Sequence, residues 1–521
     1  MRREESDGRV IPQGRRKAVP TAHRARGGKA TTASKRAGQR DLFLETADSP
    51  QGAVPGARTG QPAPRVRYAV PKSRHTPGVT LPAMTMEEVA SEENLIRAFE
   101  EVAHNRGAPG PDGRSVDEVR VHLHTLLPML RRHLLDGTYR PGMIRRVWIP
   151  KPGGGERGLG IPDVIDRWVQ QAVYRVLSPH WEPTIHPSSH GFRPGRSCHT
   201  AIAEAKTYLA DGYEWVVDLD LEKFFDRVHH QRLVARLETR VKDRRLIALI
   251  QRMLKAKVVM PEGVVVNTDE GVPQGGPLSP LLSNIVLDEL DRELARRGHR
   301  FVRYADDANI YVRSERAGHR VMASVVRFIE TQLRLKVNQA KSAVARPEER
   351  HFVGFSLRRN PEDDTIEVFL SKRSKDRIDA KLRELTPRAW GQSLCGCIAT
   401  LNTYLRGWLN FFGTSCTEAV VRTLHNLDAH IRRRLRALLL RQWKRKRFIV
   451  RRLIRLGARA NTAWRRVYEG RKSLWALSHC GPVDYALDKA YFAAQGLISL
   501  EHQYRDIHRV VAPAQLSLAL E

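Results

Sequence analysis

The sequence predicts an α+β fold for its central part, followed by a helical and strongly basic region. Apolar runs with strand character alternate with helical patterns between residues 213 and 360. After about residue 372 only helical patterns remain, and Lys and Arg become much more frequent. At 521 residues the chain is long enough for more than one domain and a sizeable core.

The first 82 residues carry no apolar periodicity that could bury a core. Arg, Gly, Ala, Pro, Thr and Ser dominate this stretch, and residues 11–40 hold nine Lys or Arg and no acid. Such a composition predicts a disordered basic tail over residues 1–82. The tail fits either a loose RNA-binding arm or a plain solvated segment.

Ordered structure is expected from Thr85, whose hydroxyl precedes two glutamates as a helix cap would. Glycine- and proline-rich turns then separate the periodic segments. The expected helices are 85–103, 116–135, 163–178, 229–239, 243–255, 279–297 and 316–335. The expected strands are 144–150 and 214–220, with hairpins near 257–268 and 300–313.

The charge balance indicates a polyanionic partner. The chain has 89 Lys or Arg against 57 Asp or Glu, a net charge of +32, and nucleic acid is the commonest partner of such a surface. The alternative is a basic surface without a specific partner. No apolar run reaches the roughly 18 residues that a membrane span needs, so no membrane contact is expected.

Five scattered cysteines, an odd number, are typical of a reducing cytosol rather than of a disulfide framework. The N-terminus also lacks the apolar segment of a secretory signal. We therefore expect a cytoplasmic location.

Two adjacent carboxylates, Asp306 and Asp307, lie between apolar runs in the segment FVRYADDANIYV. Like charges at a hairpin turn repel, and bound divalent cations would remove that penalty. A third carboxylate follows the apolar strand of WVVDLDLEKFFD at Asp220, and of Asp218 and Asp220 only Asp220 is assigned as a ligand. The three carboxylates predict a catalytic site for two Mg²⁺ ions of the kind used in phosphoryl transfer, although an isolated acidic pair is more often a solvated turn.

Other segments favour a nucleotide site near these carboxylates. Lys151 and Arg157 flank the glycine run of KPGGGERGLG, which predicts the tip of a hairpin. There the two cations could bind a triphosphate or simply be solvated. Phe225 follows Asp220 closely, and its ring could pack in the core or exclude a 2′-hydroxyl. The Gly- and Pro-rich loop GVPQGGPLSPLLSN, which contains Gln274, enters a helix and could line the primer.

A basic helical segment follows in the C-terminal part. Residues 431–459 hold thirteen Lys or Arg and no acid, with Leu and Ile at helical spacing, which predicts one or two helices with an apolar and a basic face. Mutual repulsion of these cations favours a nucleic acid against them over a solvated face. The expected nucleic-acid-binding residues are Arg432, Arg433, Arg434, Lys444, Arg445, Lys446 and Arg447. Trp443 and Trp464 could stack on bases or pack in the core, and core packing is the expectation.

Taken in order, these segments resemble the motifs of bacterial group II intron reverse transcriptases. The resemblance is carried by KPGGGERGLGIP, HGFRPGRSCHTAI, VVDLDLEKFFD, GVPQGGPLSPLLSNIVLDELD, YADD, LKVNQAKS and FVGF, with LNTYLRGWLNFF similar to the maturase thumb. It implies a right-hand polymerase with fingers, palm and thumb. It also implies that Asp220, Asp306 and Asp307 are the catalytic carboxylates.

The resemblance assigns further roles. Lys151 and Arg157 match residues that contact the triphosphate, and Phe225 matches the aromatic residue that discriminates against ribose. Gln274 and Lys341 match residues beside the incoming nucleotide, and both roles rest on the resemblance alone.

The resemblance also implies domain boundaries and a function. Fingers and palm would span 83–365, the thumb 366–445 and a basic DNA- or RNA-binding region 446–521. The protein would bind group II intron RNA, assist its splicing and copy it from dNTPs into DNA at a target DNA site. Without paired Cys motifs, an ending of the endonuclease-lacking type is expected. The alternatives are a free-standing reverse transcriptase in a host process such as defence and a maturase that only assists splicing.

Overall fold

The computed structural model describes residues 83–151, 155–387, 391, 393–470 and 473–517. All described residues belong to one compact unit. The predicted basic tail over 1–82 therefore lies outside the described residues.

The N-terminal helices are α1 (Met86–Val89), α2 (Glu92–His104), α3 (Val116–Val121) and α4 (Leu123–Leu135). Side-chain caps begin three of them, because the Thr85, Ser91 and Ser115 hydroxyls accept hydrogen bonds from the first-turn backbone. A long helix, α5 (Val164–Trp181), packs against α2.

A four-stranded sheet has the order β2-β1-β4-β5. Its strands are β1 (Ile144–Pro150), β2 (Glu156–Ile161), β4 (Val258–Val259) and β5 (Val265–Val266). Strands β1 and β2 form an antiparallel hairpin that pairs Pro150 with Glu156 and Ile149 with Arg157. The predicted hairpin between Lys151 and Arg157 is thus confirmed.

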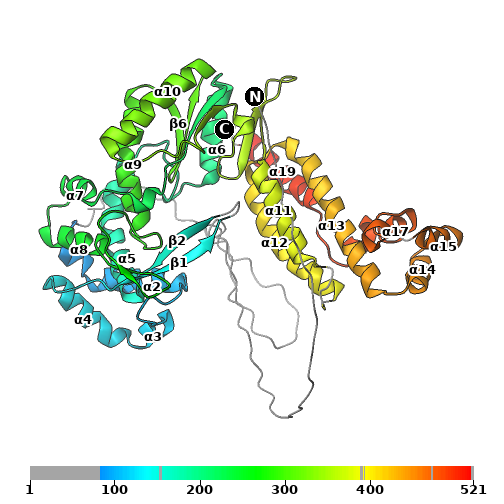
Figure 1. Cartoon of the computed structure of the whole chain (residues 1–521), viewed down its shortest axis with the longest axis horizontal. Coiled ribbons are helices and arrows are strands. Elements are labelled where there is room, and N and C mark those ends of the chain that lie inside the picture. The colour runs from blue at the N-terminus through cyan, green and yellow to red at the C-terminus, as the bar shows by residue number, and fades with distance from the viewer. Residues whose placement is uncertain (1–82, 152–154, 388–390, 392, 471–472, 518–521) are drawn as a thin grey trace, which may run out of the picture. The chain divides into compact units, whose positions relative to one another are not determined.

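A second sheet has the order β6-β7-β3-β8 and is antiparallel throughout. Its strands are β3 (Trp215–Leu219), β6 (Arg300–Tyr304), β7 (Asp307–Val312) and β8 (Ala343–Ala345). The helices of this part of the chain are α6 (Cys198–Ala210), α7 (His230–Glu238), α8 (Arg244–Leu254), α9 (Ser279–Arg296) and α10 (Glu315–Phe328), of which α6, α9 and α10 contact the sheet. Figure 1 shows α9 and α10 beside β6.

The C-terminal part opens with a two-stranded sheet, β9 (Phe355–Arg359) and β10 (Ile366–Leu370), and is otherwise helical. Its longer helices are α11 (Lys372–Leu385), α12 (Leu394–Ser415), α13 (Val421–Gln442), α14 (Lys446–Arg455), α15 (Ala460–Tyr468) and α19 (Leu500–Ser517). Three short helices complete it: α16 (Leu474–Leu477), α17 (Gly481–Ala486) and α18 (Lys489–Ala494). Helices α12, α13 and α19 run side by side (Figure 1).

Strand β3 separates two hydrophobic cores. Val217 and Leu219 belong to a core shared with α1, α2, α5 and helices α7 to α10. Val216, on the other face, belongs to a core shared with α6, the β9–β10 sheet and the C-terminal helices. Both faces of β3 are therefore covered, which fixes its register and the position where it ends.

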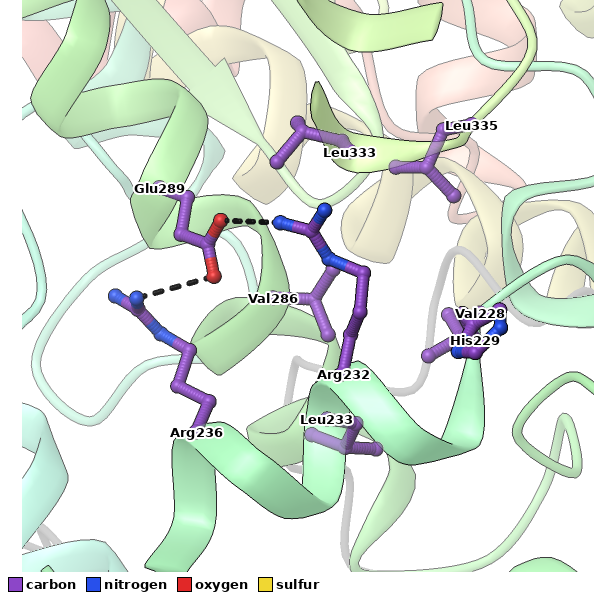
Figure 2. Close-up of a pocket in the computed structure, with 9 residues that line it drawn as sticks. All are labelled: Val228, His229, Arg232, Leu233, Arg236, Val286, Glu289, Leu333 and Leu335. Atoms are coloured by element: carbon purple, nitrogen blue, oxygen red, sulfur yellow. Dashed lines mark hydrogen bonds and ion pairs between the residues drawn. The ribbon is translucent and has the colours of Figure 1, made fainter. Parts of the chain in front are cut away.

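Acidic and basic side chains join α7 to α9 at the edge of a small pocket. Glu289 accepts hydrogen bonds from Arg232 (2.9 Å) and Arg236 (3.1 Å), and Val228 and Leu335 contribute apolar walls (Figure 2). None of the predicted catalytic or nucleotide-binding residues lines this pocket. We therefore interpret it as a packing feature between the two helices.

The predicted helices and strands up to residue 335 are present within a few residues of the expected bounds. Helix α6 and strands β8, β9 and β10 were absent from the prediction, whereas the helical region begins with α11 at Lys372, as expected. No helix in the described ranges is both long and apolar enough to cross a membrane.

Candidate active site

The acidic pair lies at the turn between β6 and β7. Tyr304 pairs with Asp307 across this hairpin, and Ala305 takes a left-handed backbone conformation with φ of +58°. A left-handed residue makes the tight reversal possible, at some conformational cost for alanine. The turn presents Asp306 and Asp307 at one end of the sheet, beside the end of β3.

Arg303 anchors this turn from the protein interior. Its guanidinium is fully buried and donates to Asp291 (2.8 and 2.6 Å), to Asn284 (3.0 Å) and to Ser189 (2.7 Å). It also donates to the carbonyl oxygen of Ala305 at 2.8 Å, directly before Asp306. The conformation of the acidic turn therefore rests on a buried, fully hydrogen-bonded arginine.

The segment before α6 lies directly against the same turn. His190 N–H donates to the Arg303 carbonyl, and Arg303 N–H donates to the Ser188 carbonyl, both at 2.8 Å. A Cβ added to Gly191 would approach the backbone nitrogen of Ala305 to 2.2 Å, so only glycine fits there. The HGF segment therefore packs against the YADD turn, although the two are far apart in the sequence.

Residues 337–342 enclose Asp220. The Asn338 side chain donates to Asp220 Oδ2 at 2.9 Å, and the Asp220 N–H donates to Ser342 Oγ at 3.0 Å. Lys341 Nζ lies 3.5 Å from Asp220 Oδ2. The structure thus brings Lys341, which the resemblance placed near the nucleotide, to one of the predicted metal ligands.

Arg350 connects this segment to Asp218. Its guanidinium contacts Asp218 Oδ2 at 2.6 Å and donates to the Lys341 carbonyl oxygen at 2.6 Å. Asp218 is therefore paired with an arginine, although it lies near enough for its charge to raise the pKa of Asp307 as well. Sequence reasoning did not identify Arg350, Asn338 or Ser342, because none of them carries a motif of its own.

The carboxylates crowd one another electrostatically. Burial and the nearby charge of Asp220 raise the pKa of Asp306, while Arg157 and Arg303 oppose that rise. Burial, followed by the charges of Asp306, Asp218 and Asp220, raises the pKa of Asp307 to about 8. Asp307 nonetheless keeps surface that is accessible to solvent.

Crowded carboxylates of this kind fit a divalent cation. Oxygen ligands suit Mg²⁺, and its charge would offset the repulsion that raises these pKa values. Within the described ranges, no three acidic, His or Cys side chains already converge tightly enough to form a metal-binding group. The carboxylate oxygens are therefore suitable ligands for Mg²⁺, but in this structure their side chains do not converge on a single ion position.

The β1–β2 hairpin brings a cation, Arg157, close to the acidic turn. Arg157 Nε donates to Gln274 Oε1 at 2.7 Å, and Arg157 acts on the pKa of Asp306. The backbones approach closely, because Gly160 N–H donates to the Gln274 carbonyl (2.7 Å) and Gly275 has φ of +124°. Lys151 is exposed near the hairpin tip. Arg157 and Gln274 are thus brought to the acidic turn.

Phe225 lies next to the loop that carries Gln274. Its ring is 7% exposed and packs edge-to-face on Phe224, with ring centres 5.4 Å apart. Its carbonyl accepts a hydrogen bond from Val272 N–H at 2.6 Å, two residues before Gln274. Core packing and proximity to the nucleotide loop therefore coexist at this residue.

The predicted nucleic-acid-binding cations differ in their surroundings. Arg434 donates to the Thr386 carbonyl at 3.0 Å, and the Arg433 guanidinium lies 4.2 Å from the Trp475 ring centre. In contrast, Lys444, Arg445 and Arg447 are exposed, while Arg432 and Lys446 are half-buried. Core packing is right for Trp443, which is buried, and wrong for Trp464, which is 43% exposed.

Comparison with known families agrees with this geometry. Residues 149–357 match the reverse transcriptase (RNA-dependent DNA polymerase) family, and residues 375–457 match the maturase-specific domain of group II introns. The first match contains the acidic turn, Asp220, Arg157, Gln274 and Lys341. The second contains the basic residues 432–447.

Individual relatives cover only part of the chain. Protein YkfC of Escherichia coli K12 is 41% identical over 41% of this chain and 56% of its own length. The group II intron-encoded protein LtrA of Lactococcus lactis is 37% identical over 37% of this chain and 32% of its own length. The matched region thus spans about half or less of these relatives.

The α+β architecture, the two family matches and their order along the chain agree with one another. The fold is that of a right-hand polymerase, and the described helices after β10 include the maturase-specific segment. The chain thus carries a reverse transcriptase domain followed by a group II intron maturase-specific domain.

Proposed function

We propose that the protein is an RNA-directed DNA polymerase that binds group II intron RNA, assists its splicing and copies it into DNA at a target site. The observation that carries the proposal is the meeting of Asp220, Asp306 and Asp307 with Lys341 and Arg157 around one end of a sheet. The maturase-specific domain supports the RNA partner and the role in splicing.

The reaction would join a primer 3′-hydroxyl to the α-phosphate of a dNTP, with pyrophosphate as the leaving group. Asp220, Asp306 and Asp307 would hold two Mg²⁺ ions, which when bound stabilise the attacking and leaving oxygens. Arg157 and Lys151 would bind the triphosphate through charge, since both lie on the facing hairpin.

Lys341 and Gln274 would orient the nucleotide from opposite sides. Lys341 is held next to Asp220, where its ammonium also limits carboxylate repulsion. Gln274 is fixed by Arg157 and by the backbone contact with Gly160. Phe225 would lie beneath the sugar and exclude a 2′-hydroxyl by its bulk.

The proposed function also implies domain boundaries. Fingers and palm would span 83–365 and the thumb 366–445, which includes most of the maturase-specific match. Residues 446–521 would form the basic region that contacts DNA or RNA. Target DNA and intron RNA would be the macromolecular partners, and dNTPs the small substrates.

The test is to separate polymerisation from splicing with one substitution. Asp306→Ala should abolish primer extension, because it removes a metal ligand, while intron RNA binding and splicing persist, since the RNA supplies its own catalytic metals. Asp211→Ala, an exposed aspartate after α6, is the matched control and should leave both activities intact. Primer extension retained by Asp306→Ala would overturn the active-site assignment. Loss of splicing in a folded, RNA-binding variant would overturn the separation of functions.

A further inference from the structure

Helix α15 carries an exposed pair of stacked aromatic rings. Trp464 and Tyr468 lie one helical turn apart and are 43% and 47% exposed. Their ring centres are 5.5 Å apart, and the ring planes differ by 26°. The helix buries its other face through Ala463 and Val467, so these large rings are not used in the core. Burial of such rings is normally favourable, which makes their exposure informative.

The surface around this pair is strongly positive. Residues 441–466 contain eleven Lys or Arg and no acid. Lys446 Nζ lies 5.4 Å from the Tyr468 ring centre, and Arg451 and Arg465 are exposed on the adjoining helices α14 and α15. Two further exposed aromatic residues lie on the same group of helices, Phe448 on α14 and Tyr485 on α17.

Aromatic rings among cations match the chemistry of an unpaired nucleic-acid strand. The phosphates of a strand would meet the cations, and its bases would stack on the rings. A duplex has no free base faces to offer, and an apolar protein partner would gain nothing from this concentration of cations. We propose that Trp464 and Tyr468 form a stacking platform for the bases of a single-stranded nucleic acid.

This inference deepens the proposed function, on which it rests for nucleic acid as the partner. It adds that α14 and α15 hold an unpaired stretch of the strand, outside the polymerase site. Because stacking contacts only the base, the platform should not distinguish ribose from deoxyribose.

The test uses the full chain with its polymerase site saturated by unlabelled primer–template duplex. Binding of fluorescent U20, dT20, an abasic 20-mer and a 20-base-pair duplex is then measured for each variant. Trp464→Ala/Tyr468→Ala should weaken U20 and dT20 binding about tenfold to a hundredfold, with little effect on the abasic strand or the duplex. Trp464→Phe/Tyr468→Phe should restore most of the loss, since the rings return.

A charge variant distinguishes stacking from general attraction. Arg451→Gln/Arg465→Gln should weaken all four probes together and flatten their dependence on salt, whereas the alanine variant should keep the wild-type salt slope. Unchanged single-strand affinity in the alanine variant, or an equal loss on the duplex, would overturn the platform. A wild-type chain that binds strands but never extends a primer would instead overturn the proposed function.

Discussion

Arg303 and Asp291 form a two-pronged ion pair whose side chains are 1% and 0% exposed. The two hydrogen bonds measure 2.8 and 2.6 Å, and the same guanidinium holds the carbonyl of Ala305 at the acidic turn. A charge pair in this position costs desolvation energy, which its geometry must offset. Its position next to Asp306 indicates that it serves the shape of the turn.

Breaking the ion pair between Arg303 and Asp291 should lower the free energy of unfolding substantially. Arg303→Met leaves Asp291 buried without its partner, and we expect a loss of about 3–5 kcal/mol in the free energy of unfolding. Arg303→Met/Asp291→Leu should recover much of that stability but not primer extension, because the Ala305 carbonyl still lacks its donor. Urea unfolding and primer extension on both variants check this. Equal urea midpoints for the single and double variants would contradict it.

Arg350 should act on nucleotide use through Lys341. Arg350→Gln releases the Lys341 carbonyl, and we expect the KM for dNTP to rise roughly tenfold, about 1.4 kcal/mol. In a Lys341→Ala background the same change should have little further effect, because residues that act as a unit are not additive. Steady-state kinetics of the two single variants and the double variant measure this coupling. Fully additive effects would mean that Arg350 does not position Lys341.

Phe225 should govern the choice of sugar. Phe225→Val removes the ring beside the nucleotide loop, so incorporation of ribonucleotides should rise relative to deoxyribonucleotides. Phe225→Tyr keeps the ring and is expected to retain discrimination. Competition between rNTP and dNTP in primer extension gives the ratio. If the valine variant is active and equally selective, the ring has a packing role only.

The basic residues should separate into two groups in salt titrations of RNA binding. Replacing exposed Lys444, Arg445 and Arg447 with Gln should weaken RNA binding and flatten the log–log salt slope without loss of stability. Replacing Arg432–Arg434 with Gln should also lower the urea midpoint, because Arg433 and Arg434 contact Trp475 and Thr386. An unchanged slope in the first variant would place the RNA on another surface.

His351 should make stability fall in mild acid. Burial, and then the charges of Arg373, Arg377 and Arg350, lower the pKa of His351 to about 4. The folded state thus disfavours the protonated ring, so the stabilisation is present above the unfolded pKa of about 6.5 and is lost as the pH falls toward 4. The expected loss is at most about 3 kcal/mol. Urea midpoints from pH 7 to pH 5 should decline in the wild type and decline less in His351→Gln.

The sequence predicted the structure best where an apolar pattern flanks residues with an evident chemical role. Apolar runs on both sides of Asp306 and Asp307 predict the hairpin, and the structure contains it. Strand β8 has only three residues and no alternating pattern, so it is defined by its pairing with β3. Strand β10 does carry a readable signal, since Ile366, Val368 and Leu370 alternate with half-buried residues.

The supporting residues of the site were beyond sequence reasoning for a different reason. Arg303 and Arg350 are two among many arginines, and only the three-dimensional contacts distinguish them. For Trp464 the sequence pattern led to a clear but wrong prediction: an aromatic residue at helical spacing predicts a core position, and this ring is exposed. Its exposure follows from the small residues Ala463 and Val467, which occupy the buried face of α15 instead.

The contact of Gly191 with Ala305 limits how segments of this protein could be exchanged with those of a relative. Residues Ser188–Gly191 extend the edge of β6, although more than a hundred residues separate them from the acidic turn. A chimera that exchanges only the segment from β3 to β8 with a relative would break this interlock, even with every carboxylate in place. A segment exchanged with a relative should therefore begin before Ser188, so that residues 188–191 are transferred together with the turn that they support.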